Sequence, residues 1–250
     1  MDIKICYQRE VSSTNDWAKQ MAEEGARSGT LALADTQTGG KGRRGHSWDS
    51  PMEDNIYMSL ILRPEIPGFK ASQLTLVMGL SAAQGISYEL GLPVMIKWPN
   101  DLVIEGRKTG GILTEMSVSQ TKIDYVIIGI GVNVNNSGFS GNLADTATSL
   151  KLAAGHMVDK HDVMDAVLTT FEKNYAIFLK TEDLSGLQSD YNSILANRDR
   201  EVRVLDPVRP FEGIARGINA GGELLVEKPD KSMENVYAGE VSIRGGSSYI

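Results

Sequence analysis

The sequence predicts an α+β fold in which helices flank a mixed central β-sheet and a small all-β unit follows. Over the first 196 residues, strand-like apolar segments alternate with helical stripes. After residue 197 only short strand candidates remain, separated by turn signals such as Asp206-Pro207. We therefore expect two domains, residues 1–196 and 197–250. The second should be a β-barrel with strands at 201–205, 211–218, 223–227, 233–237 and 240–244.

The first elements are a strand, a helix and a strand. Residues 2–7 alternate as a strand does, and apolar residues at 17, 18, 21 and 22 form a helical stripe that Gly25 ends. Ser13 and Asp16 have the spacing of a capping box before that stripe. The Ser13-Thr14-Asn15 trio has two interpretations: a helix cap, which the residues alone favour, or polar groups that bind a ligand at a strand-to-helix junction. Residues 30–35 form the next strand.

The middle of the chain continues this pattern. Residues 55–62 are apolar on both faces, which predicts a central strand. A helical stripe runs over residues 71–90, and Gly91 and Pro93 end it. Further strands are expected at 94–98 and 122–131, with a hairpin of 102–104 and 107–116 between them. The stripe at 161–179 predicts a helix that packs on the core.

Composition limits the function. The 250 residues are 41% hydrophobic and carry a formal net charge of −7. This acidic balance argues against a general nucleic-acid binder, whose domain should be basic. Cys6 is the single cysteine, so no internal disulfide is possible and a reducing compartment, the cytoplasm, is expected. The N-terminal residues do not resemble a signal peptide, and the longest apolar run is too short to span a membrane.

The most unusual stretch is the basic loop, residues 36–48 (TQTGGKGRRGHSW). It holds four glycines together with the fixed charges of Lys41, Arg43 and Arg44. Glycines let the backbone approach a ligand, and these cations match phosphate or carboxylate oxygens. The loop lacks the Lys-Ser/Thr pair of a Walker loop. We expect it to be mobile when empty and to close over an anionic ligand; a solvated basic turn or a nucleic-acid patch are the alternatives.

Polar residues interrupt three further strands. Pro99 breaks the strand in KWPND (97–101), so Lys97 and Asp101 are expected to turn toward a common point. Lys108 precedes two glycines past which a ligand could approach the backbone. Asn133 follows an apolar strand and is either a partner for a heterocyclic base edge or a buried structural amide. Because each group follows or interrupts a strand, all of them could meet at one rim of a sheet.

Four motifs in order resemble those of the biotin protein ligase family, the biotin–acetyl-CoA-carboxylase ligases. They are GKGRRG (40–45), KWPND (97–101), KTGGILTE (108–115) and GIGVN (129–133). The resemblance spans roughly residues 10–135, with a weaker match of 198–245 to the family's SH3-like barrel. It implies a biotin/lipoate ligase catalytic fold and an enzyme that uses ATP, with Mg²⁺, to convert biotin to biotinyl-5′-AMP and pyrophosphate. The enzyme then transfers biotin to a lysine of a biotin carboxyl carrier domain, and such enzymes are commonly homodimers.

The resemblance also implies residue roles. The catalytic positions are Lys108, Arg43 and Asp101, with Asp101 placed where the incoming lysine loses its proton. The implied biotin site comprises Ser13, Thr14, Asn15, Gln37, Lys41, Gly42, Arg43, Lys108 and Gly111. The implied nucleotide site comprises Arg43, Arg44, Trp48, Asn100, Lys108 and Asn133. No dedicated metal-ligand set is expected, and His156 and His161 should be surface residues.

The chain departs from the family pattern at three points. Lys41 stands where arginine is more usual, and His46 replaces a more usual basic residue. There is no room before Ser13 for the DNA-binding helix-turn-helix of bifunctional members, so a ligase without repressor activity and without a DNA partner is expected. A lipoate ligase is the nearest alternative, although Ser13-Thr14-Asn15 and Gln37 suit a ureido ring better than a dithiolane. A non-catalytic nucleic-acid binder is the alternative from another class.

Overall fold

The computed structural model describes residues 1–52, 55–119, 122–206, 209–237 and 242–245. The larger sheet has seven strands in the order β1-β2-β3-β7-β6-β5-β4. Its strands are β1 (Lys4–Val11), β2 (Thr30–Gln37), β3 (Ile56–Leu62), β4 (Met95–Lys97), β5 (Asp101–Ile104), β6 (Arg107–Ser119) and β7 (Lys122–Val132). β1 and β2 run parallel and the other neighbours antiparallel, so the predicted mixed sheet is confirmed.

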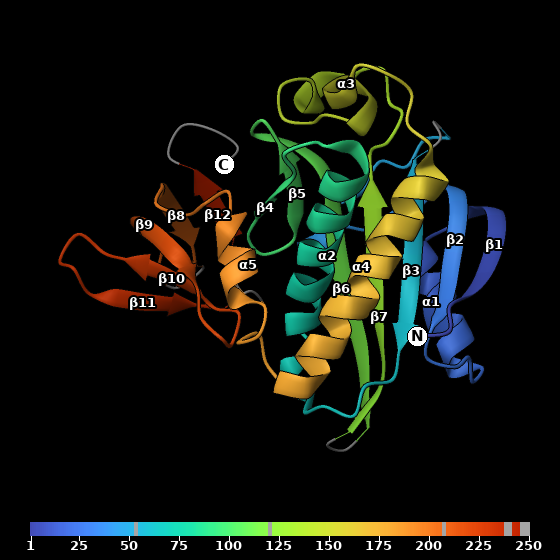
Figure 1. The fold of residues 1–250 in the computed structure, drawn as a ribbon, viewed down its shortest axis with the longest axis horizontal. Coiled ribbons are helices and arrows are strands. Elements are labelled where there is room, and N and C mark those ends of the chain that lie inside the picture. The colour runs from blue at the N-terminus through green and yellow to red at the C-terminus, as the bar shows by residue number, and fades with distance from the viewer. Residues whose placement is uncertain (53–54, 120–121, 207–208, 238–241, 246–250) are drawn as a thin grey trace.

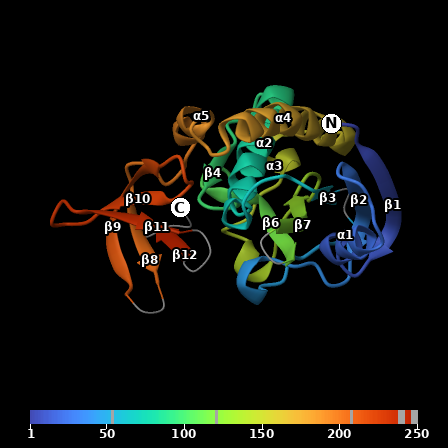
Figure 2. The ribbon, with the colours of Figure 1, turned by 90° about the horizontal axis from the view of Figure 1, so that it is seen from below.

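Helices cover the two faces of this sheet unequally. α2 (Gln73–Leu90) and α4 (Lys160–Thr181) lie side by side on one face, while α1 (Thr14–Glu23) lies on the other beside β2 and β3 (Figures 1 and 2). The strands obey their period of two. On β7, Ile128 and Ile130 join the large apolar core on the side of α2, whereas Ile127 packs with Ala18 of α1. The face that α1 only partly covers is therefore available for a site.

Local signals explain where the helices begin and end. α2 ends at Gly91, which adopts a left-handed conformation, and Asp159 caps α4 by accepting a hydrogen bond from the backbone N–H of His161. The expected capping box of α1 is wrong. Ser13 occupies the N-cap position but makes no side-chain cap hydrogen bond, and Asp16 pairs with Lys41 instead. The Asp16 side chain is thus directed toward the basic loop.

The C-terminal strands form a second, antiparallel sheet. Its strands are β8 (Glu201–Leu205), β9 (Phe211–Ile218), β10 (Leu224–Glu227), β11 (Met233–Val236) and β12 (Ser242–Gly245), in the order β11-β10-β9-β8-β12. The start of the last predicted strand, at residues 240–241, lies outside the described residues. One apolar core includes Leu224 of β10 and Leu76 of α2, and Trp98 Nε1 donates to the carbonyl oxygen of Gly222 at 3.0 Å. The domain boundary at residue 197 and the closure of an SH3-like barrel remain predictions.

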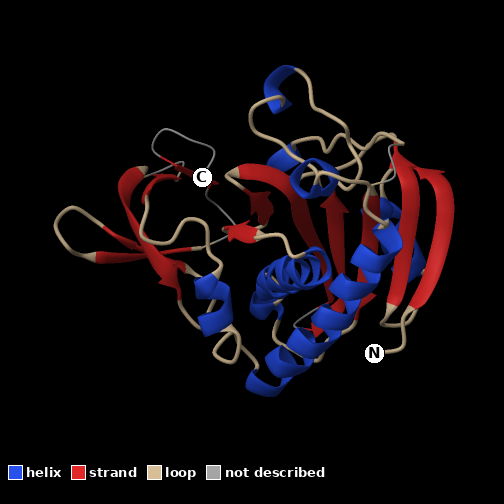
Figure 3. Cartoon of the chain, turned by 45° about the horizontal axis from the view of Figure 1, so that its top comes forward, coloured by secondary structure: helices blue, strands red, loops and turns tan. Residues whose placement is uncertain are grey.

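Two short helices complete the fold: α3 (Leu150–Ala154) and α5 (Gln188–Ser193). Long loops gather beside α3 at the end of the larger sheet where β7 stops (Figure 3). Within the described part of the chain, no helix has the length and apolar character needed to cross a membrane.

Candidate active site

The floor of the candidate site is the glycine-bearing face of β7. Gly129 and Gly131 follow Ile127 at a period of two and so share its face. A Cβ atom on Gly129 would lie 2.0 Å from Asn15 Oδ1, and one on Gly131 would lie 2.7 Å from Trp48 Nε1. Any larger residue would therefore collide with these side chains. The two glycines of the GIGVN motif make room for α1 on one side and for the basic loop on the other.

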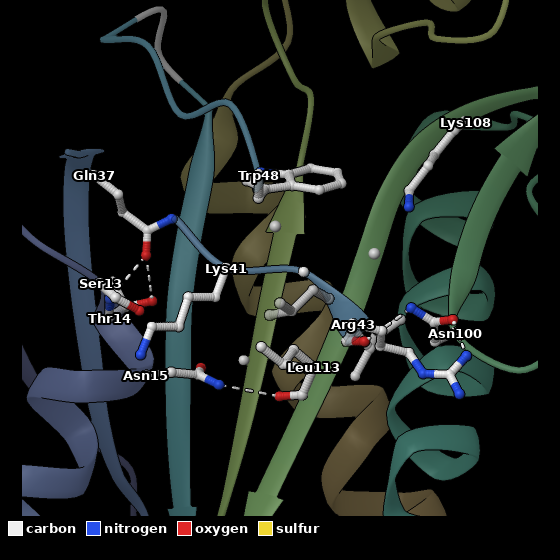
Figure 4. A pocket seen from close by; sticks show the side chains of 16 residues that line it. Ser13, Thr14, Asn15, Gln37, Lys41, Arg43, Trp48, Asn100, Lys108 and Leu113 are labelled. Carbon is white, nitrogen blue, oxygen red and sulfur yellow. Dashed lines mark hydrogen bonds between the residues drawn. The ribbon is translucent and has the colours of Figure 1, made fainter. Parts of the chain in front are cut away.

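An inner pocket opens on this floor between α1, the basic loop and β6 (Figure 4). All nine residues implied for the biotin site line it, namely Ser13, Thr14, Asn15, Gln37, Lys41, Gly42, Arg43, Lys108 and Gly111. Leu113 and the two β7 glycines, which sequence reasoning did not assign, line it as well. The pocket therefore combines a polar end at α1 with an apolar and glycine wall from the sheet.

A buried hydrogen-bond network holds the polar end. The backbone N–H and the hydroxyl of Thr14 both donate to Gln37 Oε1, at 2.8 and 3.0 Å. Gln37 Nε2 donates to the hydroxyl of Ser50 at 2.8 Å. Ser59 on β3, which is fully buried, places its hydroxyl 2.8 Å from Thr14 Oγ1 and 2.6 Å from Asn15 Oδ1. These bonds fix the orientation of the Gln37 amide, so that its second N–H remains for a ligand.

The same network offers two oxygen acceptors around a single hydroxyl. Asn15 Nδ2 donates to Glu115 Oε2 at 2.6 Å and to the carbonyl oxygen of Leu113 at 3.3 Å, so Asn15 Oδ1 faces Ser59. Ser59 has one hydroxyl proton, while Thr14 Oγ1 and Asn15 Oδ1 both lie within hydrogen-bond distance of it. Thr14 Oγ1 also donates its own proton to Gln37 Oε1, so both oxygens keep acceptor capacity beyond the Ser59 proton. The polar end is therefore suited to a ligand that offers N–H donors and a carbonyl acceptor.

The basic loop is folded as a small hairpin. Trp48 N–H donates to the carbonyl oxygen of Gly40 at 2.9 Å, and Gly42 N–H donates to that of His46 at 2.7 Å. Arg44 turns the chain with a φ of 58°, and Gly45 follows with a φ of 76°. This turn directs alternate side chains to different sides of the loop. The mobility expected for the loop remains a prediction.

Two cations of the basic loop, Lys41 and Arg43, reach in opposite directions. Lys41 Nζ pairs with Asp16 Oδ1 at 2.6 Å on the α1 side, whereas Arg43 Nη1 donates to Asn100 Oδ1 at 3.1 Å on the β5 side (Figure 4). The hydrogen bond that Lys41 donates to Asp16 raises the pKa of Lys41. Burial lowers the pKa of the Arg43 guanidinium, and the nearby charge of Asp101 opposes that shift. The guanidinium nevertheless stays protonated at neutral pH, because arginine starts from a very high pKa.

Lys108 is the second cation at the centre of the site. Its ammonium forms an ion pair with Asp101 Oδ1 at 2.5 Å and lies 5.2 Å from the centroid of the Trp48 ring. A Cβ on Gly111 would be only 3.4 Å from Lys108 Nζ, so this glycine leaves room for the lysine side chain. The backbone N–H of Lys108 donates to the carbonyl oxygen of Thr146 at 2.7 Å, which ties the start of β6 to the loop after β7. The position of Lys108 is thus fixed at its backbone by Thr146 and at its ammonium by Asp101.

An outer, more open pocket adjoins the inner one. All six residues implied for the nucleotide site line it, together with Asp101: Arg43, Arg44, Trp48, Asn100, Lys108 and Asn133. Lys97 and the loop residues Phe139, Ser140 and Leu143 also line it. No motif marked that loop, because its contribution depends on where it packs. The cavity volume is about 590 Å³, against about 60 Å³ for the inner pocket.

The asparagines after β7 have mainly structural contacts. Asn135 Nδ2 donates to the carbonyl oxygen of Val158 at 2.8 Å, and its Oδ1 accepts from the Val158 N–H at 3.0 Å. Asn133 Nδ2 donates to the carbonyl oxygen of Thr148 at 3.2 Å while the residue lines the outer pocket. Asn135 is therefore a buried structural amide, and Asn133 combines a structural bond with a place at the pocket wall.

The fold and the site present two adjoining pockets, one with a polar end at α1 and one with several cations in its wall. The model of the Biotin/lipoate A/B protein ligase family matches residues 7–133, and that of the Biotin protein ligase C terminal domain matches residues 199–244. Since the first match covers more than half of the chain, the chain belongs to the biotin/lipoate A/B protein ligase family.

Individual relatives agree with this assignment. The chain is 39% identical to the Bifunctional ligase/repressor BirA of Bacillus spizizenii over 241 residues, covering 96% of this chain and 74% of that protein. It is 32% identical to the Biotin--[acetyl-CoA-carboxylase] ligase of Paracoccus denitrificans over 87% of this chain and 91% of that one. The solved biotin protein ligase of Aquifex aeolicus in complex with biotin and ATP has a TM-score of 0.84 at 29% identity, covering 97% and 99% of the two chains.

Proposed function

We propose that this protein is a biotin protein ligase that converts biotin and ATP to biotinyl-5′-AMP and then biotinylates a lysine of a carrier domain. One observation carries the proposal: the inner and outer pockets share Gly42, Arg43, Trp48, Asn100 and Lys108 as common walls. A ligand that enters each pocket would therefore meet the other at these residues. The Aquifex aeolicus relative, whose structure was solved with biotin and ATP, supports the pairing of ligands.

The inner pocket suits the ureido ring of biotin. The two ureido N–H groups would donate to the acceptors that share the Ser59 proton, and the ureido oxygen would accept from Ser13 and the remaining Gln37 N–H. The dithiolane ring of lipoate has neither an N–H group nor a carbonyl, so it would forgo these hydrogen bonds, each worth about 0.5–1.5 kcal/mol. The contacts of this pocket therefore favour biotin over lipoate.

The cations support the first half-reaction. A biotin carboxylate oxygen attacks the α-phosphorus of ATP, the bond from that phosphorus to the bridging oxygen breaks, and pyrophosphate leaves. Negative charge then builds on the phosphate oxygens, which preorganised cations stabilise. We assign this task to Lys108 of β6 and Arg43 of the basic loop, the two cations that line both pockets. Trp48 would stack on the adenine, with Asn133 beside it and Arg44 at the outer edge.

The second half-reaction needs a proton acceptor. The amine of the incoming lysine attacks the acyl carbon, AMP leaves, and the amine loses a proton. Asp101 lines the outer pocket and is the carboxylate paired with Lys108. When Lys108 turns toward the anionic intermediate, Asp101 is released to accept that proton. We propose this exchange of partners as the link between the two half-reactions.

Mg²⁺ would enter with the nucleotide. Among the described residues, no three His, Cys, Asp or Glu side chains are grouped to hold a metal ion. Mg²⁺ in nucleotide sites commonly takes phosphate oxygens, waters and one or two protein oxygens. Asp49, Asn100 and Asp101 supply side-chain oxygens along the outer pocket and fit that limited role. The ion would supply further neutralisation of the ATP phosphates.

The partners follow from the reaction. We propose a biotin carboxyl carrier domain as the acceptor, since the Paracoccus denitrificans relative is named as a ligase for acetyl-CoA carboxylase. Cytoplasmic location and homodimer formation also belong to the proposal.

Pyrophosphate release tests the proposal. The purified protein is incubated with ATP and Mg²⁺ and either biotin or lipoate, and the bound product is analysed by mass spectrometry. We expect release with biotin and a bound biotinyl-AMP, followed by transfer when a carboxyl carrier domain is added. Pyrophosphate release with lipoate but not with biotin would show that the assignment of biotin as the substrate is wrong. Release with neither acid, together with salt-sensitive binding of DNA or RNA, would favour the nucleic-acid binder.

A further inference from the structure

The ion pair between Asp16 and Lys41 has no part in the proposed chemistry. Asp16 lies in the first turn of α1, and its carboxylate contacts the Lys41 ammonium at 2.6 Å. The two side chains are 42% and 46% exposed, so neither is held in place by burial. In Figure 4 the Lys41 side chain extends toward Asn15, away from Lys108 and Arg43. The positive charge of Lys41 therefore pairs with Asp16 of α1, and it does not point at the wall that the two pockets share.

The basic loop is attached at both sides of the inner pocket. On the α1 side, besides the ion pair, the Gly39 N–H donates to the carbonyl oxygen of Ser12 at 2.7 Å. On the other side Arg43 holds Asn100. Between these attachments the Lys41–Ser47 bridge keeps the two arms of the hairpin together. The raised pKa of Lys41 is consistent with a formed hydrogen bond to Asp16, and the charge of Glu115 acts in the same direction.

We propose that Asp16 and Lys41 form a clasp that holds the basic loop across the inner pocket and so sets how long a ligand stays there. Asp16 is a positioning residue that acts through Lys41 and does not touch the ligand. The inference rests on the proposed function for the identity of the ligand, biotin, but the holding of the loop itself does not depend on it. Because the pair is exposed, its contribution should be that of a surface ion pair, about two- to fivefold in the population of the open loop.

The first test needs no ligand. Arg44 is exposed at the tip of the loop, and trypsin should cleave after it faster when the hairpin opens, because cleavage needs several residues of extended backbone. We expect Asp16→Asn to raise the rate of this cleavage about two- to fivefold. Asp2→Asn is the control, since it breaks another exposed ion pair, Arg27–Asp2 at 2.5 Å, at the opposite end of β1. Equal cleavage rates in all three proteins would overturn the clasp.

The second test measures release of biotin by stopped-flow displacement. Asp16→Asn should speed release about two- to fivefold at low salt, and the difference from wild type should vanish near 1 M salt, where charges are screened within about 3 Å. The charge swap Asp16→Lys with Lys41→Asp should restore slow release, which a purely structural role of Asp16 would not explain. Unchanged release in Asp16→Asn would overturn the inference while leaving the ligase intact. Absence of biotin binding by the wild type would overturn the proposed function, and the cleavage test would then decide the clasp alone.

Discussion

Replacing Gly131 with alanine should impair nucleotide binding through one side chain, the indole of Trp48. A Cβ at this position would lie 2.7, 2.8 and 3.1 Å from Nε1, Cε2 and Cζ2 of the indole. Ordinary contacts begin near 3.4 Å, so the ring must retreat by about 0.7 Å or more. The hairpin that carries Trp48 can yield more easily than the central strand β7 can. The substitution should therefore move the wall of the outer pocket and keep the sheet.

The expected size of the effect follows from stacking. A base stacked on an aromatic ring contributes about 1–3 kcal/mol, which corresponds to about 5-fold to 150-fold in affinity. We expect Gly131→Ala to weaken ATP binding within this range, as measured by isothermal titration. Thermal unfolding of the same variant should be little changed, because alanine loses less conformational entropy in a strand than glycine does.

A double-mutant cycle isolates the cause. In a Trp48→Ala background the new methyl group meets no indole, so adding Gly131→Ala should cost almost nothing more. The coupling between the two sites would then account for most of the loss. The reasoning is refuted if Gly131→Ala leaves ATP affinity unchanged, or if it weakens binding by the same factor with and without Trp48.

Three other substitutions probe the network, the proton acceptor and the pH dependence. Ser59→Ala removes a buried donor, so it should lower the unfolding free energy by about 1–3 kcal/mol. Saturating biotin should recover part of this loss in a thermal melt. No recovery would argue against donation from a ureido N–H group to Asn15. Asp101→Asn should slow transfer from preformed adenylate by about 100-fold or more, and more than it slows adenylate formation in single-turnover assays; equal slowing would mean that Asp101 only orients Lys108. Burial raises the pKa of Tyr175 to about 12, above its ordinary value of 10.0, so its stabilisation is complete below pH 10 and is lost as the pH rises toward 12. Tyr175→Phe should flatten the alkaline limb of the stability curve, and an unchanged limb would contradict the assignment.

Much of the fold follows from periodicity in the sequence. The five C-terminal strands appear almost where the alternation places them, and the apolar run at 55–62 is the fully buried strand β3. Turn signals such as Gly91 end helices by a local mechanism that needs no tertiary information. α3 was not predicted, since five residues are too few for a helical stripe.

The candidate site could be predicted where a motif bears the contact. Residues of the four motifs line the two pockets. Their glycines stand where another side chain comes close to the backbone, and their charged residues lie in the pocket walls. Ser59 and Glu115 could not be assigned a contact, because each meets Asn15 only through packing of segments 44 and 100 residues away. The direction of the Lys41 side chain could not be predicted from the sequence either. Its partner, Asp16, is determined by where α1 packs against the basic loop. Long-range contacts, not local patterns, decide these positions.

The central claim is that one acyl-adenylate spans both pockets with its phosphate between Lys108 and Arg43. A crystal structure of the protein with biotinyl-5′-AMP tests it most directly. We predict the ureido ring beside Thr14 and Asn15, the phosphate within hydrogen-bond distance of both cations, and the adenine against Trp48. A phosphate out of reach of Lys108 and Arg43, or an adenine in the inner pocket, would contradict the account.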